Sequence, residues 1–351
     1  MVVSLRTLAL SILILASCSG GGDRPAGGAP TRTLTIGAYT TPREVYDREI
    51  LPAFETWWKQ KTGEDVVFET SWQGSGAQSR AIVGGFEADI AALSLEADVT
   101  RIAKAGLITR DWKAGPTGGM VASSVACLAV RPGNPKGFRD WADLARGDVE
   151  VLTPNVRTSG GAMWNVAAIY GATLRGHTPA NANDPVAAER LLSSILQRVA
   201  IMDKGARESI VTFEKGVGDV AITYENEVLA ARLAGRDTDY VIPTSTILIV
   251  NPIAVVDAYA EKHGVLDLAD AFVAFTLEQE AQRALARYGY RPVDPAVRDE
   301  TASRFPPVTD LFTIEDLGGW PVVIATLFDQ GGMYDRAMGA SDESPEAAGA
   351  R

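Results

Sequence analysis

The sequence predicts an α/β protein built as two lobes. Its 351 residues are enough for about two domains, at roughly 150 residues per domain. Strand-like and helix-like segments alternate in residues 33–105 and again in residues 121–231, an order typical of parallel sheets with helices on both faces. Hydrophobic residues make up 46% and charged residues 22% of the chain. These values are close to those of ordinary globular proteins and argue against a wholly disordered chain or a polytopic membrane protein.

The first unit is expected to contain three strands and three helices. The alternating run Thr33–Tyr39 predicts the first strand. Thr41 and Glu44 are spaced as in a capping box, Pro42 suits a first helical turn, and the apolar face that follows ends at Gly63. The other expected elements are strands at 66–70 and 89–95, a helix that opens at Gly74-Ser75-Gly76 and ends near Gly84-Gly85, and a short helix at 99–105.

The second unit is longer and less regular. A strand is expected at Val121–Val130, and Ser159-Gly160-Gly161 opens a helix that runs to about Tyr170. The other expected elements are strands at 149–153, 220–224, 240–242 and 248–256, helices at 187–199, at 206–215 and through 231, a short helix at 141–144, and a long helical region at 268–287. We find no internal repeat.

The chain after about residue 250 must pack on one of these units. The first unit has few strands of its own, so we expect it to take the late segment back. Crossover strands are then expected near Val121–Leu128 and Thr246–Val250, with a cleft between the lobes. The predicted division is residues 33–121 plus 250–338 for lobe 1 and residues 122–249 for lobe 2. The small, acidic segment 339–351 has the composition of a disordered tail.

The N-terminus has the features of an export signal. Arg6 is the only charge in residues 1–17, and the apolar run after it is too short to span a bilayer. The run ends in Leu15-Ala16-Ser17-Cys18, which resembles the bacterial lipobox, whose cysteine is lipidated and becomes the new N-terminus. We therefore expect a lipoprotein anchored in the periplasm or at the outer face of the cell envelope, with residues 18–32 as its tether. The alternative is a plain signal peptide with an incidental cysteine.

Charge and motif content argue against several classes of protein. The formal net charge of −11 is unlike that of a nucleic-acid binder. Two cysteines and two histidines are too few for a Cys/His metal cluster. The chain has no G-x-x-x-x-G-K-[ST], H-E-x-x-H, G-x-S-x-G or G-x-G-x-x-G motif. We therefore expect no catalytic residue, metal or cofactor, with His177 and His263 exposed and Cys127 in the core.

Four helix starts in this sequence suit an anion. They are Tyr39-Thr40-Thr41-Pro42, Gly74-Ser75-Gly76, Thr158-Ser159-Gly160-Gly161 and Lys204-Gly205-Ala206-Arg207. A helix N-terminus leaves backbone N–H groups unpaired and carries partial positive charge, and glycine lets an oxyanion approach these groups closely. Four such ends meeting in a cleft would bind a tetrahedral oxyanion without any lysine. Taken one at a time, each is equally consistent with an ordinary N-cap.

Short motifs run through the chain in one order. They are Pro42–Tyr46, Gly74-Ser75-Gly76, Glu87–Ile90, Arg131–Lys136, Thr153–Asn155, Thr158–Asn165, Gly205–Arg207, Gly216–Val220, Tyr224–Glu227, Tyr290–Pro292, Leu311–Ile314 and Gly318–Trp320. On these motifs the chain resembles, from Thr33 to about Tyr334, the sulfate-binding proteins of ABC importers, including the related thiosulfate-binding proteins. The resemblance implies the two-lobed periplasmic binding protein fold of type II, with sulfate held between the lobes by neutral donors of helix N-termini.

The resemblance also implies a set of site residues. The matching donors are Ser75, Ser159, Gly160, Gly161 and Ala206. Thr40 stands where the family often has an aspartate that donates its backbone N–H. Tyr224 stands where the family has an indole donor, and the chain is one residue shorter between Ala206 and Tyr224. Either the tyrosine hydroxyl replaces the indole N–H or a water does.

The expected function is capture of sulfate or thiosulfate for an ABC permease by a monomeric, membrane-anchored binding protein. Sulfate carries no proton at neutral pH and suits a site made of donors only, whereas phosphate keeps a proton and needs an acceptor. Asp203, Glu208 and Glu225 lie close in sequence to the implied site and leave that point open. The alternatives are another tetrahedral oxyanion such as molybdate or phosphate, an envelope sensor of the ion, or a hydrolase on the same fold.

Overall fold

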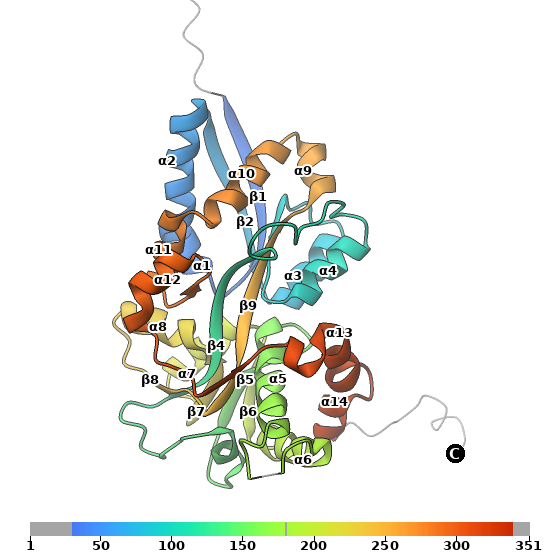
Figure 1. The fold of residues 1–351 in the computed structure, drawn as a ribbon, viewed down its shortest axis with the longest axis vertical. Coiled ribbons are helices and arrows are strands. Elements are labelled where there is room, and N and C mark those ends of the chain that lie inside the picture. The colour runs from blue at the N-terminus through green and yellow to red at the C-terminus, as the bar shows by residue number, and fades with distance from the viewer. Residues whose placement is uncertain (1–29, 180, 340–351) are drawn as a thin grey trace, which may run out of the picture.

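Two long strands link two lobes in the computed structural model, which describes residues 30–179 and 181–339 (Figure 1). The strands are β4 (Met120–Val130) and β9 (Ser245–Val255), and the first half of β4 pairs antiparallel with the middle of β9. The last part of β4 pairs with a strand of lobe 2, and the last part of β9 pairs with a strand of lobe 1. The expected crossovers are therefore confirmed. The expected signal peptide, Cys18 and residues 340–351 of the tail lie outside the described residues.

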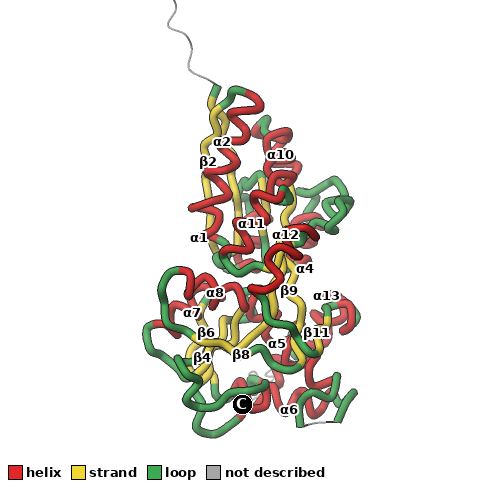
Figure 2. The backbone as a smooth tube through the Cα atoms, turned by 60° about the vertical axis from the view of Figure 1, so that its left-hand side comes forward, coloured by secondary structure: helices red, strands yellow, loops and turns green. Residues whose placement is uncertain are grey.

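Lobe 1 is a sheet covered on both faces. Its strands β1 (Thr31–Tyr39), β2 (Asp65–Gln73) and β3 (Ile90–Ala92) are parallel, and β10 (Arg291–Pro292) pairs with β4. One face packs on α2 (Leu51–Thr62), α10 (Leu266–Thr276) and α11 (Gln279–Arg287), seen beside the sheet in Figure 2. The other face packs on α3 (Ser75–Val83) and α4 (Glu96–Lys104). The remaining elements are α1 (Arg43–Val45), η1 (Tyr46–Ile50), α9 (Asp257–His263), α12 (Pro295–Thr301) and η3 (Ala302–Arg304).

Lobe 2 repeats this arrangement with shorter strands. Parallel β5 (Val151–Pro154), β6 (Val199–Asp203) and β7 (Val220–Tyr224) join β4, which also pairs with β8 (Asp239–Val241). The helices are η2 (Trp141–Ala145), α5 (Gly160–Leu174), α6 (Pro185–Leu196), α7 (Ala206–Glu214) and α8 (Glu225–Leu233). Buried α5 lies in the larger core and α7 covers the opposite face.

The C-terminal segment packs differently from our expectation. We assigned residues 250–338 to lobe 1, and α9 to α12 do lie there. From Asp310 onward the chain instead packs on lobe 2, where β11 (Asp310–Phe312) pairs with the start of β9. It continues through η4 (Glu315–Leu317), α13 (Gly319–Val323), η5 (Ile324–Phe328) and α14 (Met333–Ala337). Their apolar side chains share one core with α5 and α6, which the order of elements along the chain could not reveal.

Several local expectations also need correction. The first strand begins at Thr31 rather than at Thr33. Thr41 does not cap the following helix, because Pro42 occupies the N-cap position and no side-chain cap is formed. The helix expected at 187–199 ends at Leu196, and Val199 starts the edge strand β6, which we did not predict. The helical region 268–287 is divided into α10 and α11.

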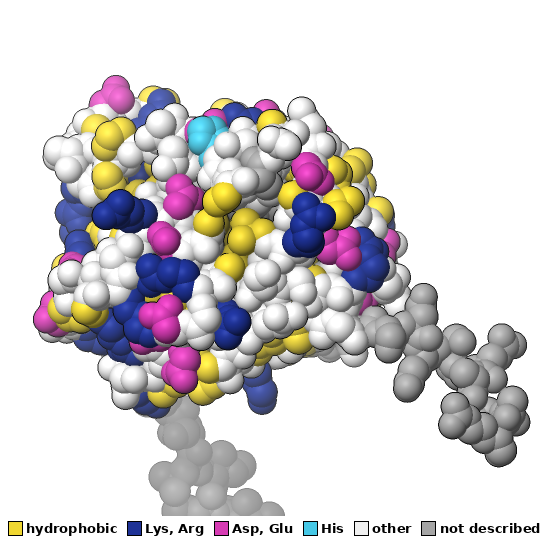
Figure 3. Space-filling model, turned by 90° about the horizontal axis from the view of Figure 1, so that it is seen from below, with side chains coloured by type: hydrophobic (Ala, Val, Ile, Leu, Met, Phe, Trp, Pro, Cys, Tyr) yellow, Lys and Arg dark blue, Asp and Glu magenta, His cyan; other side chains and the backbone are white. Residues whose placement is uncertain are grey.

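The far end of lobe 2, seen from below in Figure 3, has Lys and Arg side chains next to Asp and Glu side chains. Ion pairs in this lobe include the exposed pair Arg232–Asp239 at 2.7 Å and the half-buried pair Lys136–Asp219 at 2.9 Å. An exposed pair such as Arg232–Asp239 contributes about 0–1 kcal/mol, so its main effect is on surface charge. Within residues 30–179 and 181–339, no helix has the length and apolar character needed to cross a bilayer.

His263 closes an ion-pair cluster in lobe 1. Its ring nitrogens lie 2.7 Å from Asp89 Oδ1 and 3.1 Å from Glu87 Oε2. Asp89 is fully buried and also accepts the backbone N–H of Thr35 at 2.7 Å. The hydrogen bond to Asp89, and then that to Glu87, raises the pKa of His263 above its usual value of 6.5. The structure confirms that His263 is exposed, as the sequence predicted, and shows in addition that it is paired with two carboxylates.

We expect this cluster to make stability depend on pH. A raised folded-state pKa means that protonated His263 stabilises the fold fully below about pH 6.5, and that this contribution is lost as the pH rises through the raised pKa. Replacing His263 with glutamine should therefore lower the melting temperature more at about pH 6 than at about pH 9. A difference between wild type and variant that is the same at both pH values would contradict the assignment.

Candidate functional site

A small cavity lies between the lobes, where all seven predicted site residues meet. Its empty volume, which includes space open to solvent, is about 180 Å³. The predicted residues that line it are Thr40, Ser75, Ser159, Gly160, Gly161, Ala206 and Tyr224. Tyr39, Thr41 and Gly74, which belong to the helix starts named from the sequence, line it as well, and so does Ser94, which the sequence did not mark. The cavity is therefore small and leaves no room for a large organic ligand.

The sheet topology explains this convergence. The lining residues follow the carboxyl ends of parallel strands: β1, β2 and β3 from lobe 1, and β5, β6 and β7 from lobe 2. Ligands of open α/β sheets bind outside the carboxyl ends of the strands. Because helices α3, α5 and α7 begin in the turns after β2, β5 and β6, their N-termini point at one place. Each helix start alone is only a weak indication of an anion site, but the fold brings these helix starts together at one cavity.

The start of α5 forms the densest part of the site. Ser159 is the N-cap, but its side chain makes no capping hydrogen bond, and its hydroxyl has no other hydrogen-bond partner among residues 30–179 and 181–339. A Cβ on Gly161 would lie 3.0 Å from Ala206 Cβ and 3.3 Å from both Ser159 Oγ and Tyr224 OH. The first N–H groups of a helix have no partner within it. Backbone donors and hydroxyls therefore surround one point next to Gly161.

Ser75 contributes differently from what the sequence suggested. Its hydroxyl donates to Asp98 Oδ2 at 2.6 Å and accepts the backbone N–H of Ser94 at 3.0 Å. Asp98 also accepts from Arg101 Nη1 at 2.6 Å. A hydroxyl carries one proton, so the Ser75 side chain has none left for a ligand. The donor that Ser75 offers is the backbone N–H at the start of α3.

Two side-chain contacts join the lobes at or beside the cavity. Thr40 Oγ1 lies 3.4 Å from Glu208 Oε2, and Tyr224 OH lies 2.7 Å from Ser94 Oγ. Burial raises the pKa of Tyr224 well above its usual value, which keeps its hydroxyl protonated. The protonated tyrosine hydroxyl therefore lies at the cavity, where it is a candidate donor. Ser94 is a single serine after β3 with no sequence signal that could have marked it.

No charged side chain is among the residues that line the cavity. The three carboxylates left open by the sequence lie outside the lining. Asp203 accepts from Thr212 at 3.1 Å, Glu208 touches the site through Thr40, and Glu225 accepts from Arg291 Nε at 2.7 Å. Within the described part of the chain, no group of three or more His, Cys, Asp or Glu residues is placed to hold a metal ion. The cavity is thus a neutral, donor-rich site.

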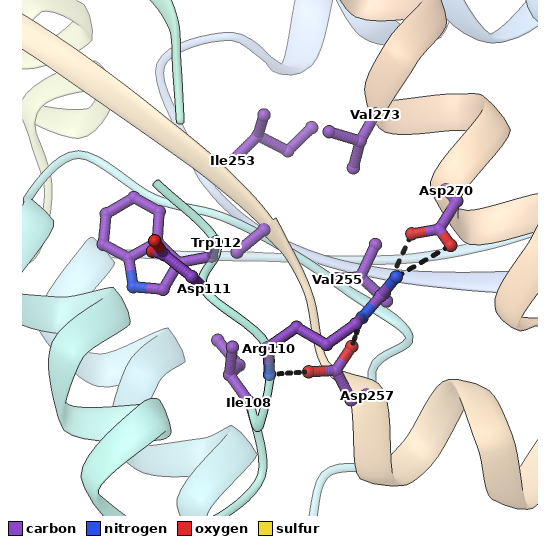
Figure 4. Close-up of a pocket in the computed structure, with 10 residues that line it drawn as sticks. Ile108, Arg110, Asp111, Trp112, Ile253, Val255, Asp257, Asp270 and Val273 are labelled. Carbon is purple, nitrogen blue, oxygen red and sulfur yellow. Dashed lines mark hydrogen bonds and ion pairs between the residues drawn. The ribbon is translucent and has the colours of Figure 1, made fainter. Parts of the chain in front are cut away.

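A larger cavity in lobe 1 is built differently (Figure 4). Its empty volume is about 530 Å³, and Ile108, Ile253, Val255 and Val273 give it apolar walls. Its one cation, Arg110, donates to Asp257 Oδ1 at 2.6 Å and to both oxygens of Asp270 at 2.8 and 2.9 Å. The charge of Arg110 is therefore already compensated, and none of the predicted site residues lies there.

Comparison with known proteins places this chain in a family. A family profile described as bacterial extracellular solute-binding protein matches residues 34–291. A sulfate-binding protein of Synechococcus elongatus is 40% identical over 334 residues, covering 94% of this chain and 93% of the relative. A thiosulfate-binding protein of Escherichia coli is 33% identical, covering 90% and 94%. The solved structure of the sulfate-binding protein SubI from Mycobacterium tuberculosis H37Rv has a TM-score of 0.78 and 38% identity, covering 85% of this chain and all of that one.

Proposed function

Because the chain belongs to the bacterial extracellular solute-binding protein family, among the sulfate- and thiosulfate-binding proteins, we propose that it captures sulfate or thiosulfate for an ABC importer. The ion would lie in the cavity between the lobes, against Thr40, Ser75, Ser159, Gly160, Gly161, Ala206 and Tyr224. The observation that carries the proposal is a small cavity lined only by neutral groups, at the N-termini of α3, α5 and α7. Unpaired N–H groups and the helix dipoles favour an anion there.

The hydrogen-bonding groups of the cavity favour a dianion that carries no proton. Sulfate and thiosulfate only accept hydrogen bonds at neutral pH, and the cavity offers backbone N–H groups and free hydroxyls. Hydrogen phosphate would bury an O–H that needs an acceptor, and no carboxylate lines the cavity. An unpaired buried polar group costs about 1–3 kcal/mol. The arrangement therefore favours sulfate over phosphate.

We propose binding without catalysis. Hydrolysis of a sulfate ester would need a nucleophile next to a base, and the lining contains hydroxyls but no histidine, lysine or carboxylate. The two histidines are engaged elsewhere, His263 with Asp89 and His177 with Asp310. An assay with a sulfate ester should accordingly show no turnover.

The function is tested by calorimetric titration of the purified protein against sulfate, thiosulfate, phosphate and molybdate, with chloride as the control anion. We expect saturable 1:1 binding of sulfate or thiosulfate and much weaker binding of phosphate. A protein that prefers phosphate would contradict a site that offers donors but no carboxylate acceptor. A protein that binds none of the four oxyanions would overturn the proposed function.

We propose that the protein is a lipoprotein anchored through Cys18. The described chain enters lobe 1 at the start of β1, and the cavity lies at the other end of this nine-residue strand. A tether attached at that end leaves the cleft free to face a permease. Metabolic labelling with a fatty acid should mark the wild type and leave Cys18→Ala unlabelled. Cys127→Ala, which removes the buried thiol of β4, is the matched control and should be labelled like the wild type.

A further inference from the structure

Two hydroxyls from opposite lobes bond to each other at the cavity. Ser94 follows β3 in lobe 1, and Tyr224 ends β7 in lobe 2. Their oxygens are 2.7 Å apart, and either one can be the donor. Both residues are 1% exposed and both line the cavity. The contact is therefore part of the site and not of the protein surface.

The two hydroxyls have one more O–H group than their mutual hydrogen bond requires. Two hydroxyls carry two protons, and their mutual hydrogen bond uses one. Among the described residues, neither hydroxyl has another recorded acceptor. A buried O–H without an acceptor is unfavourable, and the cavity is the open space that both hydroxyls face. One proton of the pair is thus directed at whatever occupies the cavity.

The backbone holds Ser94 in this place without help from its hydroxyl. Its N–H donates to Ser75 Oγ at 3.0 Å, and its carbonyl accepts from Trp164 Nε1 at 3.0 Å. A Cβ on Gly160 would lie 2.8 Å from Ser94 Oγ, so the hydroxyl also lies against the start of α5. The Ser94 hydroxyl can therefore be removed with little effect on the loop.

We infer that Ser94 is a ligand-contacting residue, and that Ser94 and Tyr224 act as one shared hydrogen-bond donor to the bound oxyanion. This inference rests on the proposed function. Since the mutual bond can run in either direction, either hydroxyl can supply the free proton. When one hydroxyl is removed, the other loses its partner and can turn its own proton to the ion. Loss of the donor then requires loss of both hydroxyls.

The test is a double-mutant cycle of sulfate affinity with Ser94→Ala, Tyr224→Phe and the double variant. We expect each single variant to bind less than about fivefold more weakly, and the double variant about ten- to hundredfold more weakly than the product of the single effects. Ser303→Ala, at an exposed serine of lobe 1, is the matched control and should bind like the wild type.

Thermal unfolding without sulfate checks that the variants fold. Should the double variant not fold, Ser94→Cys in the Tyr224→Phe background carries the same expectation, because a thiol is only a weak donor.

The outcomes separate the possible errors. If Tyr224→Phe alone accounts for the whole loss in the double variant, Ser94 is not a shared donor and the inference is wrong. The same holds if the double variant binds sulfate as tightly as the wild type, or if the two single effects simply multiply. A wild-type protein that binds no oxyanion would overturn the proposed function, and the inference with it.

Discussion

Replacing Gly161 with alanine is expected to weaken sulfate binding by at least about a hundredfold. The new Cβ would stand 3.0 Å from Ala206 Cβ and 3.3 Å from Ser159 Oγ and Tyr224 OH, in the space where the donors converge. An ion displaced from this point loses two or more hydrogen bonds. A hydrogen bond to a charged group contributes about 1.5–3 kcal/mol, and each 1.4 kcal/mol or so is a tenfold change in affinity.

The matched control for this variant is Gly147→Ala. Gly147 also lies in lobe 2, its φ is not in the left-handed region, and a Cβ there meets nothing within 4 Å. It should leave the affinity for sulfate unchanged, and calorimetric titration of both variants provides the comparison. Unfolding without ligand should confirm that Gly161→Ala remains folded. If Gly161→Ala binds sulfate as the wild type does, the ion does not lie at the start of α5.

Much of the site could be predicted because its chemistry is local in the sequence. Helix starts such as Gly74-Ser75-Gly76 and Ser159-Gly160-Gly161 are visible as small polar residues between a strand and a helix. The structure places both at the cavity. Their convergence follows from the parallel order of the strands, since the carboxyl ends lie at one edge of each sheet. The sequence could indicate that order, but not that the two edges would face each other.

The features that could not be predicted from the sequence depend mostly on contacts between residues far apart in the chain. Ser94 belongs to the site because Tyr224, 130 positions away, bonds to it. The hydroxyl of Ser75 is unavailable because Asp98 accepts its proton, a pairing that no local pattern encodes. The capping box at Thr41 failed because Pro42 took the N-cap position. In each case tertiary contacts or a neighbouring residue decided what the side chain does.

The second large effect is expected from a substitution in the C-terminal segment, and it concerns the stability of the fold. Phe312→Ala is expected to reduce the free energy of unfolding by about 3–5 kcal/mol, the usual cost of truncating a fully buried phenylalanine. Phe312 is fully buried, and its ring lies so close to α5 that a Cβ on Gly171 would meet it at 2.3 Å. The guanidinium of Arg175 stacks over the same ring at 5.5 Å. Removing the ring takes away the main apolar contact between β11 and lobe 2.

Leu311→Ala is the matched control, because Leu311 is the preceding residue of the same strand but is 40% exposed. It should change the free energy of unfolding by no more than about 0.5 kcal/mol. Chemical denaturation followed by circular dichroism gives both values. Limited proteolysis adds an independent measurement, since a loosened segment should be cut more readily between residues 302 and 310 in Phe312→Ala only. Equal stability losses in the two variants, or unchanged proteolysis in Phe312→Ala, would show that Phe312 does not fix the segment to lobe 2.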